Sequence, residues 1–119
     1  MRRLIATLGL LICMPLMAGE AELNAAVTAL QSPNTLLIDV RTAEEFEAGA
    51  LPNAERIGHE QIASQISALA PYKDTPIVLY CRSGRRSSIA EKSLQAMGYT
   101  NLINAGGYDE LKFALESQD

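Results

Sequence analysis

The sequence predicts an α/β domain with a central parallel sheet and helices on both of its faces. Short apolar runs suited to buried strands, at 35–40 and 76–80, alternate along the chain with longer stretches in which apolar residues recur at helical spacing. No repeat, low-complexity tract or linker interrupts this alternation, and 119 residues suffice for one domain with its own core. We therefore expect a three-layer domain with right-handed crossovers between parallel strands.

Four segments are predicted to be strands, and turn residues separate them from the predicted helices. TLLIDV and IVLYC are the clearest of them, since a continuous apolar run is typical of a strand buried on both faces. The segment AGGY, which follows the last strand, is expected to form a tight turn. In chain order the predicted strands are 35–40, 54–58, 77–81 and 100–104.

Five segments between and beyond these strands are predicted to be helices. The second of them begins with the capping box Thr42-Ala43-Glu44-Glu45, and Gly98 ends the fourth. In chain order the predicted helices are 21–31, 42–49, 59–70, 87–98 and 109–117. The apolar residues expected to face the core from these helices are Leu23, Val27, Leu30, Ile62, Ile66, Leu69, Ile89, Leu94 and Met97.

The first eighteen residues, MRRLIATLGLLICMPLMA, have the pattern of a secretory signal peptide. Two arginines precede an apolar run that is too short and wrongly flanked for a stable membrane span, and small residues follow it. We expect cleavage after Ala18 or Ala21, which leaves a single domain at 19–119 in the periplasm. An uncleaved anchor is the alternative. A lipoprotein with Cys13 modified is disfavoured, because Ile12 is bulky where lipidation needs a small residue.

Loss of this segment changes the charge and the cysteine content of the protein. The net charge is −4, and residues 1–18 hold two arginines and no acid, so the remaining domain has eight basic and fourteen acidic residues, a net charge of −6. Such a surface argues against non-specific nucleic-acid binding, which depends on neutralising phosphates. Cys81 is left without an intramolecular partner, which in an exported protein indicates an intermolecular disulfide or a free reactive thiol.

The segment CRSGRRS, at 81–87, surrounds this cysteine with basic residues. Gly84 gives the backbone freedom to turn back into a helix that starts near Ser87, so that successive N–H groups point inward and form a nest for an anion. The positive N-terminal end of this helix and the guanidinium groups add positive electrostatic potential at the nest. The N–H groups, the helix end and the guanidinium groups all favour the thiolate, the nucleophilic form of cysteine, over the thiol. The alternative interpretation is a buried cysteine that acts as a small hydrophobe beside solvated arginines. The arginines concerned are Arg82, Arg85 and Arg86.

Two further charged residues lie at the carboxyl end of the predicted strand 35–40. Ligand sites in parallel sheets lie at the carboxyl ends of the strands, so Asp39 and Arg41 are expected near the same crevice as Cys81. We interpret them as a carboxylate and a guanidinium that brace the loop or a helix end. His59 is the only histidine, and a metal site needs more ligands than it can supply, so no metal is expected.

Three segments resemble rhodanese-like domains. LLIDVRTAEEFEAGALPNAERIG resembles the first signature of that family, CRSGRRS closely matches its active-site loop, and NAGGYDEL at 104–111 resembles the glycine pair near its end. The resemblance covers nearly all of the chain after the signal segment, and it is greatest to the single-domain periplasmic members, the phage-shock type among them. The chain departs from the family at Ala50-Leu51, where His-Ile is usual, and at Leu111, where an aromatic residue is usual.

The resemblance implies a sulfurtransferase that works through a persulfide on Cys81. An anionic donor such as thiosulfate would give its sulfane sulfur to Cys81 and release sulfite, and cyanide or a thiol would accept that sulfur. No metal or organic cofactor is implied, and we expect a monomer. The residues implied to cradle the sulfur or to attract the donor are Arg82, Ser83, Gly84, Arg85 and Arg86.

Two other functions are compatible with the same loop. A persulfide carrier or sensor would need the same cysteine and the same cradle. Cdc25-type phosphatases and related arsenate reductases resemble rhodaneses in fold, so the fold does not decide between them. The phosphatase pattern places its arginine at position 87, however, where this chain has Ser87, and the six-residue loop from Cys81 to Arg86 has the length typical of sulfurtransferases.

Overall fold

The protein is a three-layer α/β domain, which confirms the predicted fold class. The computed structural model describes residues 18–118, so nearly all of the predicted signal peptide lies outside the described residues. The strands are β1 (Leu36–Asp39), β2 (Glu55–Arg56), β3 (Ile77–Cys81) and β4 (Leu102–Gly107). The helices are α2 (Ala18–Ala29), α3 (Ala43–Ala48), α4 (Ile62–Leu69), α5 (Arg85–Ala96) and α6 (Tyr108–Glu116).

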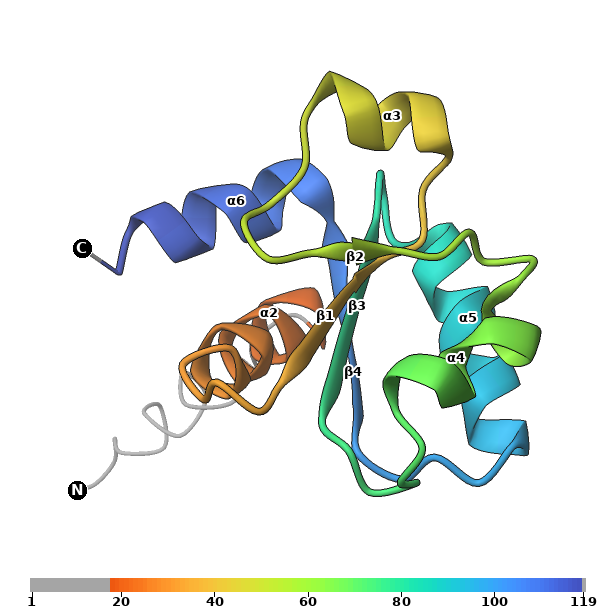
Figure 1. The fold of residues 1–119 in the computed structure, drawn as a ribbon. Helices are drawn as coiled ribbons and strands as arrows, with labels where there is room; N and C mark the ends of the chain where they lie inside the picture. The colour runs from red at the N-terminus through yellow and green to blue at the C-terminus, as the bar shows by residue number, and fades with distance from the viewer. Residues whose placement is uncertain (1–17, 119) are drawn as a thin grey trace, which may run out of the picture.

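The four strands form one parallel sheet in the order β2-β1-β3-β4, with helices on both faces (Figure 1). All five residues of β3 are buried, and neighbouring residues of a strand point to opposite faces of a sheet. Ile77, Leu79 and Cys81 therefore pack in the core under α4 and α5, whereas Val78 and Tyr80 pack in the core under α2 and α6. Within residues 18–118, no helix is long and apolar enough to cross a bilayer.

The predicted core faces of the helices are mostly confirmed, but Leu69 and Ile89 are 39% and 40% exposed. Leu69 is the last residue of α4, and Ala70, directly after it, takes the buried position. In α5 the buried stripe runs through Ala90 and Leu94, which lie four residues apart on one face. Ile89 is one residue, and hence about 100° of helix rotation, away from that stripe.

The last strand differs most from its prediction, because β4 continues through the segment AGGY that we expected to turn. A β-bulge at Ala105 lets Gly106 and Gly107 pair with the last two residues of β3. α6 then begins at Tyr108 without any intervening turn. The glycine pair is therefore part of the sheet, directly beside Cys81.

α3 is attached to the domain by its ends. The predicted capping box is present, with Glu45 N donating to Thr42 Oγ1 (3.1 Å) and Thr42 N donating to Glu45 Oε1 (2.9 Å). No residue of α3 is buried, and the helix stands clear of both helical layers at the carboxyl ends of the strands (Figure 1). The capping box therefore stabilises the start of the helix, and Phe46 is half-buried rather than part of either core.

Candidate active site

Cys81 is the last residue of β3, and the chain turns back toward its sulfur within three residues. Gly84 has a φ of 98°, a backbone conformation that favours glycine, and its N–H donates a hydrogen bond to Cys81 Sγ (2.9 Å). α5 begins at Arg85, two residues earlier than predicted, and brings Ser87 Oγ to 3.5 Å from the same sulfur. Cys81 is only 1% exposed, so the thiol is both buried in the core and hydrogen-bonded by the loop.

These contacts shift the pKa of Cys81 below the ordinary value of a cysteine. Burial raises the pKa, but hydrogen bonds from the Ser87 side chain and from backbone N–H groups of Ser83, Gly84 and Ser87 together lower it by more. The thiolate is the nucleophilic form of cysteine. The loop therefore favours the reactive state of a thiol that its surroundings would otherwise keep neutral.

Ser87 joins the thiol to β4. Its hydroxyl has one hydrogen and lies within reach of three acceptors: Asn104 Oδ1 (2.7 Å), Gly84 O (3.1 Å) and Cys81 Sγ (3.5 Å). Asn104 Oδ1 also accepts a hydrogen bond from Gly106 N (2.9 Å), which fixes the orientation of that amide. Sequence analysis did not identify Ser87 or Asn104 as site residues, because their contact joins positions 17 residues apart.

We predict that Ser87→Ala raises the pKa of Cys81, because it removes one of the hydrogen bonds that stabilise the thiolate. Alkylation of Cys81 by iodoacetamide should become roughly threefold to tenfold slower at neutral pH, and the midpoint of its pH profile should move upward. Ser88→Ala, one residue along the same helix, is the matched control. An unchanged midpoint in Ser87→Ala would contradict the role of this hydroxyl.

Gly107 supports the loop from the opposite side. A Cβ atom at this position would lie 2.7 Å from the carbonyl oxygen of Arg82 and would also meet the Glu110 side chain. A Cβ on Gly84 would in turn lie 3.4 Å from Gly106 Cα. Gly107 thus allows β4 to approach the loop more closely than a residue with a Cβ would permit, whereas a Cβ at Gly106 would meet no atom within 4 Å.

The three arginines of the loop occupy different environments. The side chains of Arg82 and Arg86 are 76% and 22% exposed, and Arg85 is exposed. Arg86 makes a bidentate ion pair with Glu45 of α3, with Nη1 at 2.9 Å from Oε1 and Nη2 at 3.1 Å from Oε2. Arg82 Nη1 lies 3.8 Å from Glu45 Oε2. Glu45, which sequence analysis identified only as part of a capping box, is therefore the link between α3 and the loop.

The Glu45 carboxylate is ionised throughout the physiological pH range. Hydrogen bonds from the Arg86 side chain and the Thr42 backbone lower the pKa of Glu45 to about 2. The negative charge of Glu45 thus stays close to the guanidinium groups of the loop.

Asp39 and Arg41 form a buried ion pair, with Arg41 Nη2 at 2.7 Å from Asp39 Oδ2. Arg41 N and Nε donate further hydrogen bonds to the same carboxylate, at 2.9 and 3.0 Å. Arg41 Nη2 also donates to the carbonyl oxygen of Gly49 (2.7 Å), the residue that ends α3, and the guanidinium lies 4.5 Å from the centre of the Tyr108 ring. The pair thus connects β1 to the end of α3. Within residues 18–118, none of the hydrogen bonds of Asp39 or Arg41 involves the sulfur of Cys81.

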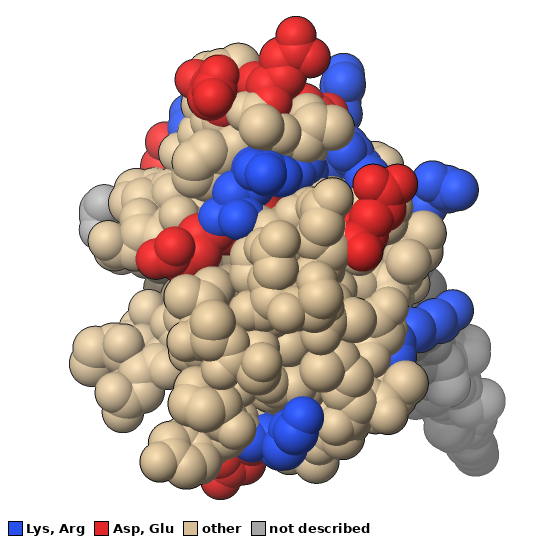
Figure 2. Space-filling model, turned by 45° about the vertical axis from the view of Figure 1, so that its right-hand side comes forward, with Lys and Arg blue, Asp and Glu red and all other residues tan. Residues whose placement is uncertain are grey.

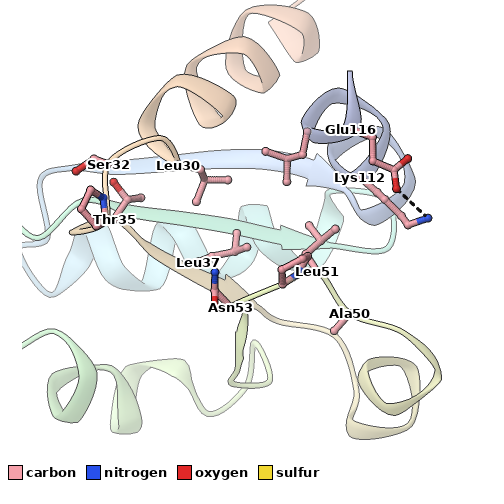
Figure 3. A pocket seen from close by; sticks show the side chains of 12 residues that line it. Leu30, Ser32, Thr35, Leu37, Ala50, Leu51, Asn53, Lys112 and Glu116 are labelled. Atoms are coloured by element: carbon pink, nitrogen blue, oxygen red, sulfur yellow. Dashed lines mark ion pairs between the residues drawn. The ribbon is translucent and has the colours of Figure 1, made fainter. Parts of the chain in front are cut away.

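Charged side chains of both signs gather around this end of the sheet (Figure 2). A hollow of about 180 Å³ lies between α3, the loop and the start of α6. A larger hollow of about 750 Å³ lies elsewhere, between the end of α2, α6 and the segment 50–53, and none of its lining residues belongs to the loop 81–87 (Figure 3). The hollow of about 180 Å³ is lined by Arg41, Glu45, Ala48, Arg82, Tyr108 and Asp109.

The part of the chain that the structure describes has no group of three or more His, Cys, Asp or Glu side chains able to hold a metal ion.

The fold and the loop together define a class of protein, the α/β domains that hold a cysteine in a short, arginine-bearing loop at the end of a central parallel strand. The chain belongs to the rhodanese-like domain family, whose match covers residues 22–114. It is 34% identical over 74 residues to the thiosulfate sulfurtransferase PspE of Escherichia coli strain K12, covering 62% of this chain and 71% of that protein.

Two solved structures extend this similarity to the fold. The human single-domain sulfurtransferase TSTD1 has a TM-score of 0.66 and 30% identity, over 76% of this chain and 91% of that chain. An E. coli rhodanese with anions has a TM-score of 0.62 and 33% identity, over 64% of this chain and 89% of that chain. The chain is thus a member of a sulfurtransferase family by both sequence and fold.

Proposed function

We propose that the protein transfers a sulfane sulfur from thiosulfate, or a similar anionic donor, to cyanide or a thiol through a persulfide on Cys81. The Cys81 thiolate attacks the outer sulfur of thiosulfate, a new S–S bond forms, and sulfite leaves with the electron pair of the bond that breaks. Cyanide or a thiolate then attacks the outer sulfur of the persulfide. Thiocyanate or a new persulfide leaves, and the Cys81 thiolate is regenerated.

The observation that carries this proposal is the hydrogen bond from Gly84 N to Cys81 Sγ within a short, glycine-bearing turn. The same N–H groups that lower the pKa of the thiol are available to the anionic sulfur of a persulfide, because both carry negative charge. The named sulfurtransferases among the relatives support sulfur as the transferred group. The similar E. coli structure with anions supports an anionic donor.

Backbone groups from Arg82 to Arg86 would cradle the transferred sulfur, and the arginine side chains would attract the donor. Asp39 and Arg41 would support the site indirectly, since their contacts run to α3 rather than to the thiol. The phosphatase pattern has an arginine at position 87. In this chain position 87 is Ser87, which is buried and hydrogen-bonded to β4. This arrangement disfavours phosphate-ester cleavage.

We further propose that the domain begins after a cleaved signal peptide and acts in the periplasm as a monomer. The basic start, short apolar run and small residues of 1–18 support export. A single thiol kept in a buried, hydrogen-bonded site suits a compartment in which exposed thiols are oxidised.

A mass spectrum of the purified protein after incubation with thiosulfate tests the proposal, together with an assay for thiocyanate when cyanide is added. We expect Cys81 to gain one sulfur atom and thiocyanate to form over many turnovers. Stoichiometric persulfide without turnover would favour a carrier or sensor instead. Hydrolysis of an aryl phosphate without any persulfide would contradict the proposal in favour of a phosphatase.

A further inference from the structure

One loop arginine, Arg86, is already bound by a carboxylate of the protein, and a second, Arg82, lies near the same carboxylate. Both terminal nitrogens of Arg86 are engaged by Glu45, at 2.9 and 3.1 Å, and Arg82 lies 3.8 Å from the same side chain. A bidentate carboxylate is the geometry in which a guanidinium would also hold an oxyanion. Glu45 therefore takes the place that an anionic donor would need on these side chains.

The surroundings of this ion pair allow it to open. Glu45 and Arg86 are 24% and 22% exposed, so water can solvate both groups when they separate. Glu45 belongs to α3, a six-residue helix that contributes no buried side chain to either core. Movement of this helix therefore exposes no fully buried side chain, although Phe46 is half-buried, and elements with few buried contacts open at lower free-energy cost than core elements.

Glu45 lines the hollow that lies beside the loop, whereas Arg86 and Cys81 do not line it. Cys81 is 1% exposed, and the hollow beside the loop is lined by Glu45 and Arg82 but not by Cys81. A donor that enters from this hollow meets the Glu45 carboxylate before it reaches the sulfur. Asp109 lines the same hollow and adds a second negative group, so the entrance is far less positive than three neighbouring arginines alone would make it.

We propose that Glu45 sets the specificity of the site for anions, by competing with the incoming donor for Arg86 and Arg82. This inference rests on the proposed sulfur transfer from an anionic donor. A doubly charged oxyanion displaces the single carboxylate from the guanidinium groups, whereas a weaker or neutral ligand does not. Glu45 thus raises the donor concentration that the protein requires, and it keeps the site closed to common monoanions.

Glu45→Gln tests this inference, because glutamine keeps a side-chain oxygen that can accept the capping bond from Thr42, while it removes the charge and replaces the second oxygen facing Arg86 by an NH2 group. We expect the KM for thiosulfate to fall roughly threefold to tenfold while kcat changes less than about twofold. Glu47→Gln is the matched control, since Glu47 lies on the same short helix, is exposed and takes no part in the ion pairs of residues 18–118. If Glu45 only positions Arg86, its loss should raise the KM, and that result would overturn the inference.

A second measurement does not depend on sulfur transfer. The rate of alkylation of Cys81 by anionic iodoacetate, divided by the rate with neutral iodoacetamide, reports how strongly the loop attracts an anion. This ratio should rise about threefold or more in Glu45→Gln and stay unchanged in Glu47→Gln. At high salt, which screens the charges, the ratio of Glu45→Gln should approach that of the wild type. A ratio in Glu45→Gln no higher than in Glu47→Gln would overturn the inference. Absence of thiosulfate turnover in the wild type would instead refute the proposed function, while a raised ratio would still support the role of Glu45.

Discussion

Replacing Cys81 with serine is expected to abolish sulfur transfer from thiosulfate. A hydroxyl in place of the thiol is a far weaker nucleophile near neutral pH, and it cannot form the persulfide on which the proposed reaction depends. The fold should survive, because serine is close to cysteine in size and its oxygen can still accept the hydrogen bond from Gly84 N. We expect a stability loss of about 1 kcal/mol, since Cys81 is buried rather than in an exposed loop.

The measurement is thiocyanate formation by the wild type and by Cys81→Ser at equal concentrations of folded protein, with folding checked by thermal denaturation. Ser88→Ala, a change in α5 just beyond the loop 81–87, is the control for general damage to the region. A folded Cys81→Ser protein with substantial activity would refute the assignment of Cys81 as the sulfur carrier.

The largest expected effect on stability is that of Asp39→Ala. Asp39 is fully buried and Arg41 is 6% exposed, so removal of the carboxylate leaves a guanidinium charge in the interior without its partner. Breaking a buried pair in this way costs about 3–5 kcal/mol, a large part of the 5–15 kcal/mol that is typical of a whole domain. The loss should appear as a lower midpoint of urea unfolding with an unchanged slope.

The double variant Asp39→Ala with Arg41→Met is the informative comparison. Replacing both charges by apolar groups removes the uncompensated charge, so the double variant should be more stable than Asp39→Ala alone. If the double variant is no more stable, or if Asp39→Ala costs less than about 1 kcal/mol, the pair does not act as described.

The fold was predictable from the sequence because its signals are local. The apolar runs of β1 and β3, the capping box before α3 and the glycine after α5 each act within a few neighbouring residues. The errors arose where packing outweighs local preference. Gly106 and Gly107 resemble a turn, but they extend β4 because they pair with Tyr80 and Cys81 of the neighbouring strand.

The candidate site was predictable only in part, for the same reason. The composition of the loop indicates a reactive thiol near anion-binding groups, and the structure places Gly84 N on the sulfur. The partners that adjust this thiol lie far away in the chain, since Glu45 meets Arg86 across 41 residues and Asn104 meets Ser87 across 17. No periodicity or motif within a single sequence indicates such pairs, because they depend on how the elements assemble.

If Cys81 carries the proposed persulfide, its burial decides which of the two sulfur atoms a nucleophile reaches. The added sulfur lies about 2 Å beyond Sγ. Attack on that outer atom passes it to the acceptor, whereas attack on Sγ itself would expel hydrosulfide and leave the protein in a mixed disulfide. Because Sγ is enclosed by the loop and the end of β3, with 1% of Cys81 exposed, the outer atom is the one left open to attack. In the proposed reaction, the same enclosure that makes the resting thiol hard to approach would thus keep each cycle from ending with the protein in a mixed disulfide.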